Sequence, residues 1–241
     1  MMFSSRARRR YREALRAYEA TPASHKEFSV IASAEAGAPS RRLVDLALAA
    51  AARARDAELR IYAGRPSREP RWFEIWPGEH YKLLAGLVAA LGARRVVEIG
   101  TFTGMGTLAL LEALPADGEL VTFDLKPWRE FPETWLADAD FASGRLVQRL
   151  ADIGEPGVIA RHAAVFESAD FIFIDGPKDG VTEPKFLAAL EPLSLKRDVV
   201  VMFDDVRVLN MVALWRALAR PKLDLTSFGH WSGTGLVDWN A

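Results

Sequence analysis

The spacing of apolar residues changes near residue 94. Before it, apolar positions recur at helical intervals in an alanine-rich stretch, which predicts a helix over Ser40–Leu59. A second apolar stripe predicts a helix over Gly78–Leu91, ended by Gly92. After residue 94, short β-branched runs alternate with segments that are long enough for crossover helices. The first third of the chain is therefore predicted to be a helical extension, and the rest an α/β domain.

Seven runs in the second part have the length and composition of strands. The first five are separated by crossover-length segments, which predicts that they are parallel. The last two are separated only by residues 232–234, so we expect an antiparallel hairpin at the C-terminal end. The predicted strands are Arg95–Ile99, Glu119–Phe123, Arg145–Leu150, Phe171–Ile174, Val199–Phe203, Leu223–Trp231 and Gly235–Trp239.

These patterns together define the expected architecture. We predict a doubly wound, Rossmann-like α/β fold with a mainly parallel seven-stranded sheet, a C-terminal antiparallel hairpin and a helical N-terminal extension. The extension is assigned to residues 1–70 and the α/β domain to residues 71–241. An apolar helical extension could form a subunit interface, so a homodimer is possible.

Composition narrows the classes of partner. The chain has 241 residues, 50% of them hydrophobic, and a formal net charge of −1, which argues against a dedicated nucleic-acid-binding protein. There is no cysteine, so disulfides and thiolate chemistry are excluded. No run is apolar enough for a signal peptide or a membrane span, so we expect a soluble, cytoplasmic protein. Six arginines crowd residues 6–16; they form either a solvated helix face or a contact for an acidic partner or membrane surface.

The most informative segment is the glycine turn between Glu98 and Gly106. A predicted strand enters the sequence Gly100-Thr101-Phe102-Thr103-Gly104-Met105-Gly106, and a predicted helix, Thr107–Leu114, follows at once. Glycines let a ligand approach the backbone, and the helix N-terminus offers free N–H groups. The spacing fits neither a dinucleotide fingerprint nor a P-loop. A purely structural turn is the alternative.

Acidic residues follow the turn at successive strand ends. Glu98 would repel a pyrophosphate but attract a cationic ligand, which favours S-adenosylmethionine over NAD. Asp124 ends the second strand, where a carboxylate can accept hydrogen bonds from both ribose hydroxyls, and Asp152 follows the third, near an adenine edge. Either aspartate could instead be a helix cap. Because ligands bind at the carboxyl edge of such sheets, the series favours a cofactor site.

The segment from Val96 to Leu110 resembles motif I of the cation-dependent O-methyltransferases, the group that contains catechol and caffeoyl-CoA O-methyltransferases. The resemblance extends over roughly residues 78–239. It implies an S-adenosylmethionine site in which the methionine end faces Glu98, Gly100 and Thr101, with Phe102 and Gly104 in the same turn. It places the ribose at Asp124 and Leu125, and the adenine near Asp152. The family commonly has serine at the position of Gly106, so one contact to the cofactor carboxylate is expected to be missing.

Two further strand ends carry acids that could hold a metal. Asp175 follows the fourth strand, and Asp204 and Asp205 follow the fifth. Carboxylates at neighbouring strand ends can converge, and a divalent cation such as Mg²⁺ would relieve their repulsion. The resemblance gives Asp175, Asp204 and Asp205 as metal ligands, Asp175 also as a cofactor contact and, with Lys178, as a catalytic residue. Alternatively, the acids cap helices or pair with Arg197 and Arg207.

Lys178 is implied by the resemblance to be a general base. We expect a nearby metal and a sulfonium to disfavour its ammonium form; a solvated loop charge is the alternative. A set of aromatic residues and one histidine could line the pocket: Trp72, Phe73, Trp76, His80, Tyr81, Trp128 and Trp231. Pro177 replaces an acid of the family pattern, and the tyrosine that follows the lysine in that pattern is absent.

The predicted function is transfer of a methyl group from S-adenosylmethionine to a hydroxyl of a small molecule, assisted by a divalent metal. Three alternatives remain open. A metal-independent methyltransferase would act on an amine, an acid or a sugar hydroxyl, and a nicotinamide oxidoreductase would use a different cofactor. A non-catalytic binding module would use the arginine-rich N-terminal segment.

Overall fold

The computed structural model describes residues 37–65, 79–208, 210–228 and 232–241. Its main helices are α2 (Arg41–Asp56), α3 (Glu79–Leu91), α4 (Met105–Ala113), α5 (Asp138–Phe141), α6 (Ala163–Glu167), α7 (Thr182–Leu190) and α8 (Met211–Ala217). Its strands are β1 (Arg95–Ile99), β2 (Glu119–Asp124), β3 (Leu146–Leu150), β4 (Phe171–Ile174), β5 (Val200–Asp204), β6 (Lys222–Asp224) and β7 (Thr234–Asp238). Short 3₁₀ turns lie at Arg60–Tyr62, Trp128–Glu130 and Ile159–His162.

The strands form one sheet in the order β3-β2-β1-β4-β5-β7-β6. Strands β1 to β5 pair in parallel, and β7 pairs antiparallel with both β5 and β6. The predicted doubly wound, mainly parallel sheet with an antiparallel end is therefore confirmed. The strand order reverses between β1 and β4, which is the place where ligands bind in such sheets.

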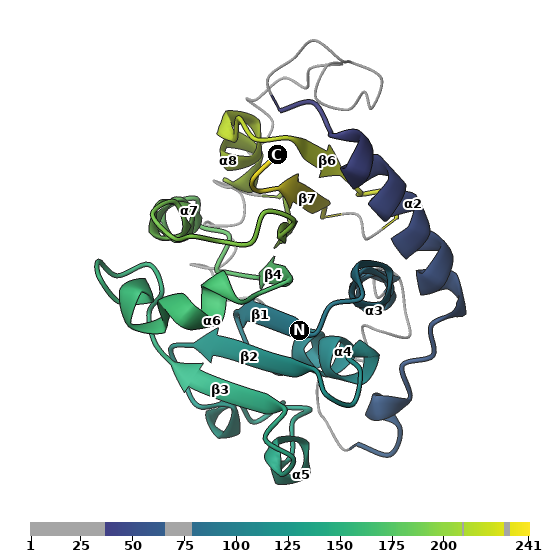
Figure 1. The fold of residues 1–241 in the computed structure, drawn as a ribbon. Helices are drawn as coiled ribbons and strands as arrows, with labels where there is room; N and C mark the ends of the chain where they lie inside the picture. The colour runs from purple at the N-terminus through teal and green to yellow at the C-terminus, as the bar shows by residue number, and fades with distance from the viewer. Residues whose placement is uncertain (1–36, 66–78, 209, 229–231) are drawn as a thin grey trace, which may run out of the picture.

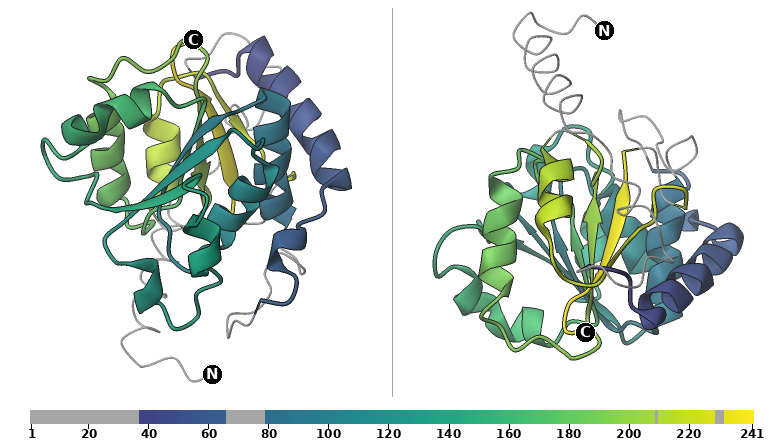
Figure 2. Two further views of the ribbon diagram at one scale, coloured as in Figure 1. Left: turned by 60° about the horizontal axis from the view of Figure 1, so that its bottom comes forward. Right: turned by 90° about the horizontal axis from the view of Figure 1, so that it is seen from above.

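Helices cover both faces of the sheet (Figures 1 and 2). One hydrophobic cluster joins α2, α3 and α4 to one face, through residues such as Leu43, Leu87 and Val96. The other joins α6, α7 and α8 to the opposite face, through Phe166, Phe186 and Ile172. Alternate residues of β1 and β4 enter different clusters because strand side chains point to opposite faces. The result is a three-layer α/β/α sandwich.

The two N-terminal helix predictions agree with α2 and α3. Ser40 caps α2, because its hydroxyl accepts a hydrogen bond from the Leu43 amide at 3.1 Å. The two helices pack closely, since a side chain on Gly86 of α3 would meet the Ala50 carbonyl oxygen at 2.3 Å. Thus α2 belongs to the layer that covers the sheet, and the proposed boundary at residue 70 stays a prediction. No helix in the described ranges has the length and apolar character needed to cross a bilayer.

The predicted strand Leu223–Trp231 is wrong in length. Strand β6 ends at Asp224, and residues 226–228 form a turn in which the Phe228 amide donates to the Leu225 carbonyl at 2.7 Å. The Asp224 carboxylate accepts the Thr226 amide at 2.8 Å, a local bond that competes with strand pairing. The connection to β7 is therefore longer than the predicted three-residue hairpin. Residues 229–231 lie outside the described part.

Candidate active site

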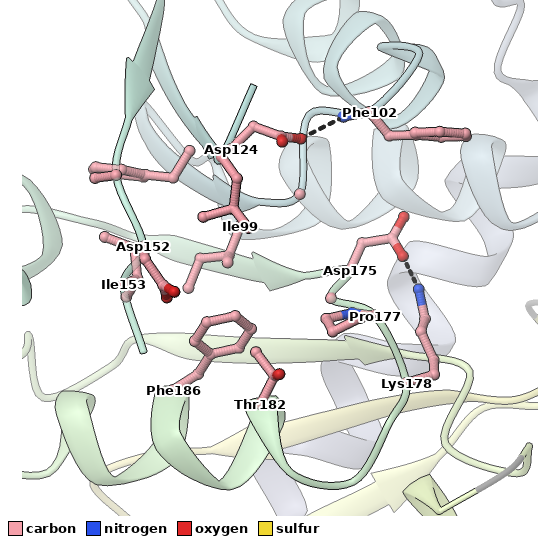
Figure 3. Close-up of a pocket in the computed structure, with 15 residues that line it drawn as sticks. Ile99, Phe102, Asp124, Asp152, Ile153, Asp175, Pro177, Lys178, Thr182 and Phe186 are labelled. Atoms are coloured by element: carbon pink, nitrogen blue, oxygen red, sulfur yellow. Dashed lines mark hydrogen bonds and ion pairs between the residues drawn. The ribbon is translucent and has the colours of Figure 1, made fainter. Parts of the chain in front are cut away.

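A cavity of about 400 Å³ opens at the carboxyl edge of the sheet, across the point where the strand order reverses (Figure 3). The ends of β1 to β4 and the start of α7 contribute its walls. Its apolar surface includes Ile99, Phe123, Ile153 and Phe186. A volume of this size suits a nucleoside-sized ligand, and pockets that bind such ligands combine apolar walls with a few polar groups. Seven of the predicted site residues line it: Gly100, Phe102, Asp124, Leu125, Asp152, Asp175 and Lys178.

The glycine turn brings the end of β1 against the end of β4. Gly100 has a φ of 108°, and a side chain there would lie 2.1 Å from the Asp175 carbonyl oxygen. Only glycine allows both this φ and this close approach. The turn therefore places the backbone at the cavity wall next to Asp175. Thr101 and Gly104 belong to the same turn but do not line the cavity.

Glu98 lies beneath the turn, on the α4 side of the sheet. Its side chain is buried, and its carboxylate accepts the Thr107 hydroxyl at 2.5 Å. Burial raises the pKa of Glu98 to about 8. The prediction of cofactor selection by its negative charge assumed an ionised group, whereas burial favours the neutral acid. A side chain on Gly106 would lie 2.8 Å from Glu98 Oε1, so the serine of the family pattern does not fit beside this rotamer.

Asp124 and Asp152 line the cavity from the ends of the neighbouring strands β2 and β3. Asp124 lies at the end of β2, as predicted. Its carboxylate accepts hydrogen bonds from the Phe102 amide at 2.9 Å and from the Lys126 amide at 3.1 Å. This bond ties the glycine turn to β2, as the dashed line in Figure 3 shows. Asp152 accepts the Gly154 amide at 2.9 Å through one carboxylate oxygen. Both carboxylates keep acceptor capacity for a ligand.

Asp175, Asp204 and Asp205 converge at the end of β4 and β5. One carboxylate oxygen from each lies within 4.8 Å of the others. Three oxygen donors from carboxylates form the donor set that Mg²⁺ and Ca²⁺ prefer, so the residues fit a divalent cation. Asp175 faces the cavity, whereas Asp204 and Asp205 do not line it. Arg207, one of the two arginines in the alternative interpretation of these acids, contacts Asp224, with Nε and Oδ2 2.8 Å apart.

Lys178 points into this cluster of carboxylates. Its ammonium contacts Asp175 and lies 3.7 Å from Asp204 Oδ2 and 3.3 Å from Asp205 Oδ2. Its side chain is 14% exposed, which rules out a solvated loop charge. Burial opposes the charge, but the three carboxylates outweigh it and raise the pKa of Lys178. The expectation that a metal and a sulfonium disfavour the ammonium form applies to a site that holds both groups, and it stays a prediction.

The backbone is strained at three places around the site. Phe102, Lys178 and Asp205 are the non-glycine residues with positive φ in the described ranges, at 43°, 59° and 57°. Such conformations cost free energy and tend to occur at functional sites. Aspartate and asparagine tolerate the left-handed region best, which suits the position of Asp205. The three residues lie in the loops that follow β1, β4 and β5.

Glu183 holds the loop that carries Lys178, and it was missed at the sequence level. It is fully buried in the first turn of α7. Its carboxylate accepts the Lys178 amide at 2.5 Å and the Gly180 amide at 3.1 Å. The sequence could have indicated this role, because Glu183 falls in the first turn of a helix that follows Asp179-Gly180. An acid at this position can accept hydrogen bonds from free backbone N–H groups.

The predicted aromatic wall is only partly within the described residues. Trp72, Phe73, Trp76 and Trp231 lie outside them, as do the arginines of residues 6–16. His80 Nδ1 lies 3.7 Å from Asp204 Oδ1, and burial, with Asp175 next, raises the pKa of Tyr81. His80 therefore faces the carboxylate cluster from α3. Trp128 does not line the cavity and stacks on Phe141 with ring centroids 5.3 Å apart.

The fold is a Rossmann-like domain with a cavity at the switch point of its sheet, the place where ligands bind in such folds. Residues 97–206 match the family model described as a methyltransferase domain. Over these residues the chain is therefore similar to methyltransferase domains, and it resembles the class I S-adenosylmethionine-dependent O-methyltransferases. The match includes the glycine turn, Asp124, Asp152 and the carboxylate cluster.

Similar proteins support the same class. Tricin synthase 1 from Oryza sativa subsp. japonica is 36% identical over 106 residues, which are 40% of this chain and 40% of that protein. Caffeoyl-CoA O-methyltransferase 2 from Petunia hybrida is 32% identical over 107 residues, 41% of each. The chain thus aligns with about two fifths of these relatives. An SAH-bound methyltransferase from Podospora anserina has the same fold, with a TM-score of 0.52, 15% identity and coverage of 100% and 98%.

Proposed function

We propose that the protein transfers the methyl group of S-adenosylmethionine to a hydroxyl oxygen of a small molecule, with a divalent cation bound beside the cofactor. One observation carries this proposal: the cavity at the glycine turn ends at the cluster of Asp175, Asp204 and Asp205. A methyl donor and a cation that binds the acceptor must lie side by side, and this arrangement would place them so.

The cavity would bind the nucleoside part of the cofactor on one side and its methionine part on the other. Asp124 would accept hydrogen bonds from the ribose hydroxyls, with Leu125 beside the sugar, and Asp152 would lie near the adenine. The turn residues Gly100, Thr101, Phe102 and Gly104 would accommodate the methionine end near Asp175. Glu98 would support this end from below the turn, where a cofactor ammonium would favour its ionised form.

Asp175, Asp204 and Asp205 would hold the cation, which lowers the pKa of a bound hydroxyl and orients it. In the transfer step, a bond forms between the methyl carbon and the acceptor oxygen while the carbon–sulfur bond breaks, leaving S-adenosylhomocysteine. The hydroxyl proton would pass to Lys178 Nζ. The three carboxylates favour the ammonium form of this lysine, so it would first have to release its own proton to water, which a bound cation and the cofactor sulfonium would favour.

A metal-independent methyltransferase is the second candidate, and one contact favours it. The Lys178 ammonium already neutralises part of the charge of the cluster. In this case the cluster would orient Lys178, and the acceptor could be an amine, an acid or a sugar hydroxyl. Activity would then persist in EDTA. The divalent-cation proposal requires activity to be lost in EDTA and restored by Mg²⁺.

Ligand binding tests the cofactor before any acceptor is known. We expect S-adenosylhomocysteine at millimolar concentration to raise the melting temperature of the chain, and NADH to leave it unchanged. The matched variant Asp124→Asn should weaken the shift, because the amide can accept fewer hydrogen bonds from the ribose. A chain that S-adenosylhomocysteine does not stabilise is not a methyltransferase of this class. A panel of catechols and related hydroxyl compounds, with and without Mg²⁺, then tests the acceptor class.

A further inference from the structure

The position of Lys178 has a consequence for cation binding. Its ammonium contacts Asp175 and lies within 3.7 Å of oxygens from Asp204 and Asp205. These are the same three carboxylates whose oxygens lie within 4.8 Å of one another. A divalent cation bound by all three would have to share the space and the lone pairs that the ammonium now uses. Two cations at such a distance repel strongly when water is largely excluded.

We infer that Lys178 is a built-in counter-cation of the carboxylate cluster, and that a divalent cation binds only by displacing its ammonium. The inference rests on the proposed metal site. It adds that this lysine sets the affinity of the site, because every binding event must first break its contacts. The lysine relieves the repulsion that three carboxylates would otherwise exert on one another.

The backbone keeps Lys178 in this position. It has a φ of 59°, and its amide donates to the buried carboxylate of Glu183 at 2.5 Å. The main chain is thus anchored independently of the side chain, so the flexible lysine side chain can swing away while the loop stays in place. Asn210 supports the same loop, since its amide group donates to the Asp179 carbonyl at 2.7 Å.

The first test measures Mg²⁺ and Mn²⁺ binding by isothermal titration calorimetry without cofactor or acceptor. Lys178→Met keeps most of the side-chain volume and removes the competing charge. We expect it to bind Mg²⁺ at least about tenfold more tightly than wild type, which corresponds to about 1.4 kcal/mol. Lys185→Met, in the exposed part of α7, removes one positive charge away from the cluster and should leave the affinity close to wild type.

Equal or weaker Mg²⁺ affinity in Lys178→Met would overturn the inference. If no variant binds Mg²⁺ or Mn²⁺, both the inference and the proposed metal site fail. S-adenosylhomocysteine binding in the same samples then shows whether the cofactor proposal survives.

A second measurement uses the wild-type chain and does not depend on a folded variant. The acetylation rates of Lys178 and Lys185 are compared by mass spectrometry, with and without saturating Mg²⁺. Displacement should make Lys178 react several-fold faster with Mg²⁺, because its amine leaves a site that is 14% exposed. Lys185 should react at the same rate in both conditions. An unchanged Lys178 rate with Mg²⁺ bound contradicts displacement.

Discussion

At the scale of single residues, Glu98 shows how burial changes the role of a charge. Its pKa is raised from about 4.5 to about 8, mainly by burial, while hydrogen bonds from threonine hydroxyls act in the opposite direction. The neutral acid is therefore the form that the folded chain favours at neutral pH. A charge argument based on the sequence alone treats every glutamate as ionised, and it cannot include this cost of desolvation.

The raised pKa predicts a pH-dependent stability. Between about pH 4.5 and pH 8 the folded state binds one more proton at Glu98 than the unfolded state, so this residue's contribution falls as pH rises. The slope is at most about 1.4 kcal/mol per pH unit. Glu98→Gln removes this contribution, so the variant should gain stability relative to wild type as pH increases through that range. Urea unfolding of both proteins from pH 5 to 9 measures the difference.

The control is Glu119→Gln, which changes an exposed carboxylate on the neighbouring strand β2. Its stability should follow that of wild type across the same range. If Glu98→Gln and wild type keep a constant difference at every pH, Glu98 does not titrate as its burial implies.

At the scale of elements, the loop between β4 and α7 depends on one buried carboxylate. Glu183 accepts the amides of Lys178 and Gly180, and both would lose their acceptor in Glu183→Ala. Unsatisfied buried groups cost about 1–3 kcal/mol each, so we expect a loss of that order in the free energy of unfolding. Glu183→Gln keeps one acceptor oxygen and should lose less.

The same variants should affect ligand binding. Since the loop carries Asp175 and Lys178 at the cavity wall, Glu183→Ala should also weaken S-adenosylhomocysteine binding in a calorimetric titration. Glu130→Ala, at an exposed position, controls for the loss of one negative charge and should change neither quantity. Wild-type stability and affinity in Glu183→Ala would show that the loop is held by other contacts.

Strands and helices with a strong local pattern of apolar residues could be predicted from the sequence. Element ends that depend on side-chain hydrogen bonds could not. Strands β1 and β4 have the predicted bounds because apolar β-branched and aromatic residues fill them. The shorter β6 depends on the bonds of Asp224 to the following turn, which no periodicity reveals. In the site, the strand-end position of Asp124 and the convergence of the three aspartates were predictable. The occupation of that cluster by Lys178 was not, because it depends on a left-handed loop residue.

At the scale of the whole molecule, helix α2 connects the N-terminal part of the described chain to its last strand. Asp238 of β7 is buried, and its carboxylate accepts the Ser40 hydroxyl at 2.7 Å and Arg42 Nη2 at 2.5 Å. The same helix packs on α3 through the close approach at Gly86. These contacts predict that α2 unfolds together with the sheet, although the sequence pattern alone suggested a separate extension.

Thermal unfolding tests this coupling in the full chain. Asp238→Ala should lower the free energy of unfolding by about 1–3 kcal/mol, because it removes the buried acceptor of Ser40 and Arg42, while Arg42 itself is 40% exposed and can be solvated. Asp45→Ala breaks an exposed pair with Arg41 at 3.7 Å and should cost less than about 1 kcal/mol. In every variant, helical circular dichroism and tryptophan fluorescence should change in one transition. Loss of helical signal before the fluorescence change would instead mark α2 as a separable unit, in agreement with a boundary near residue 70.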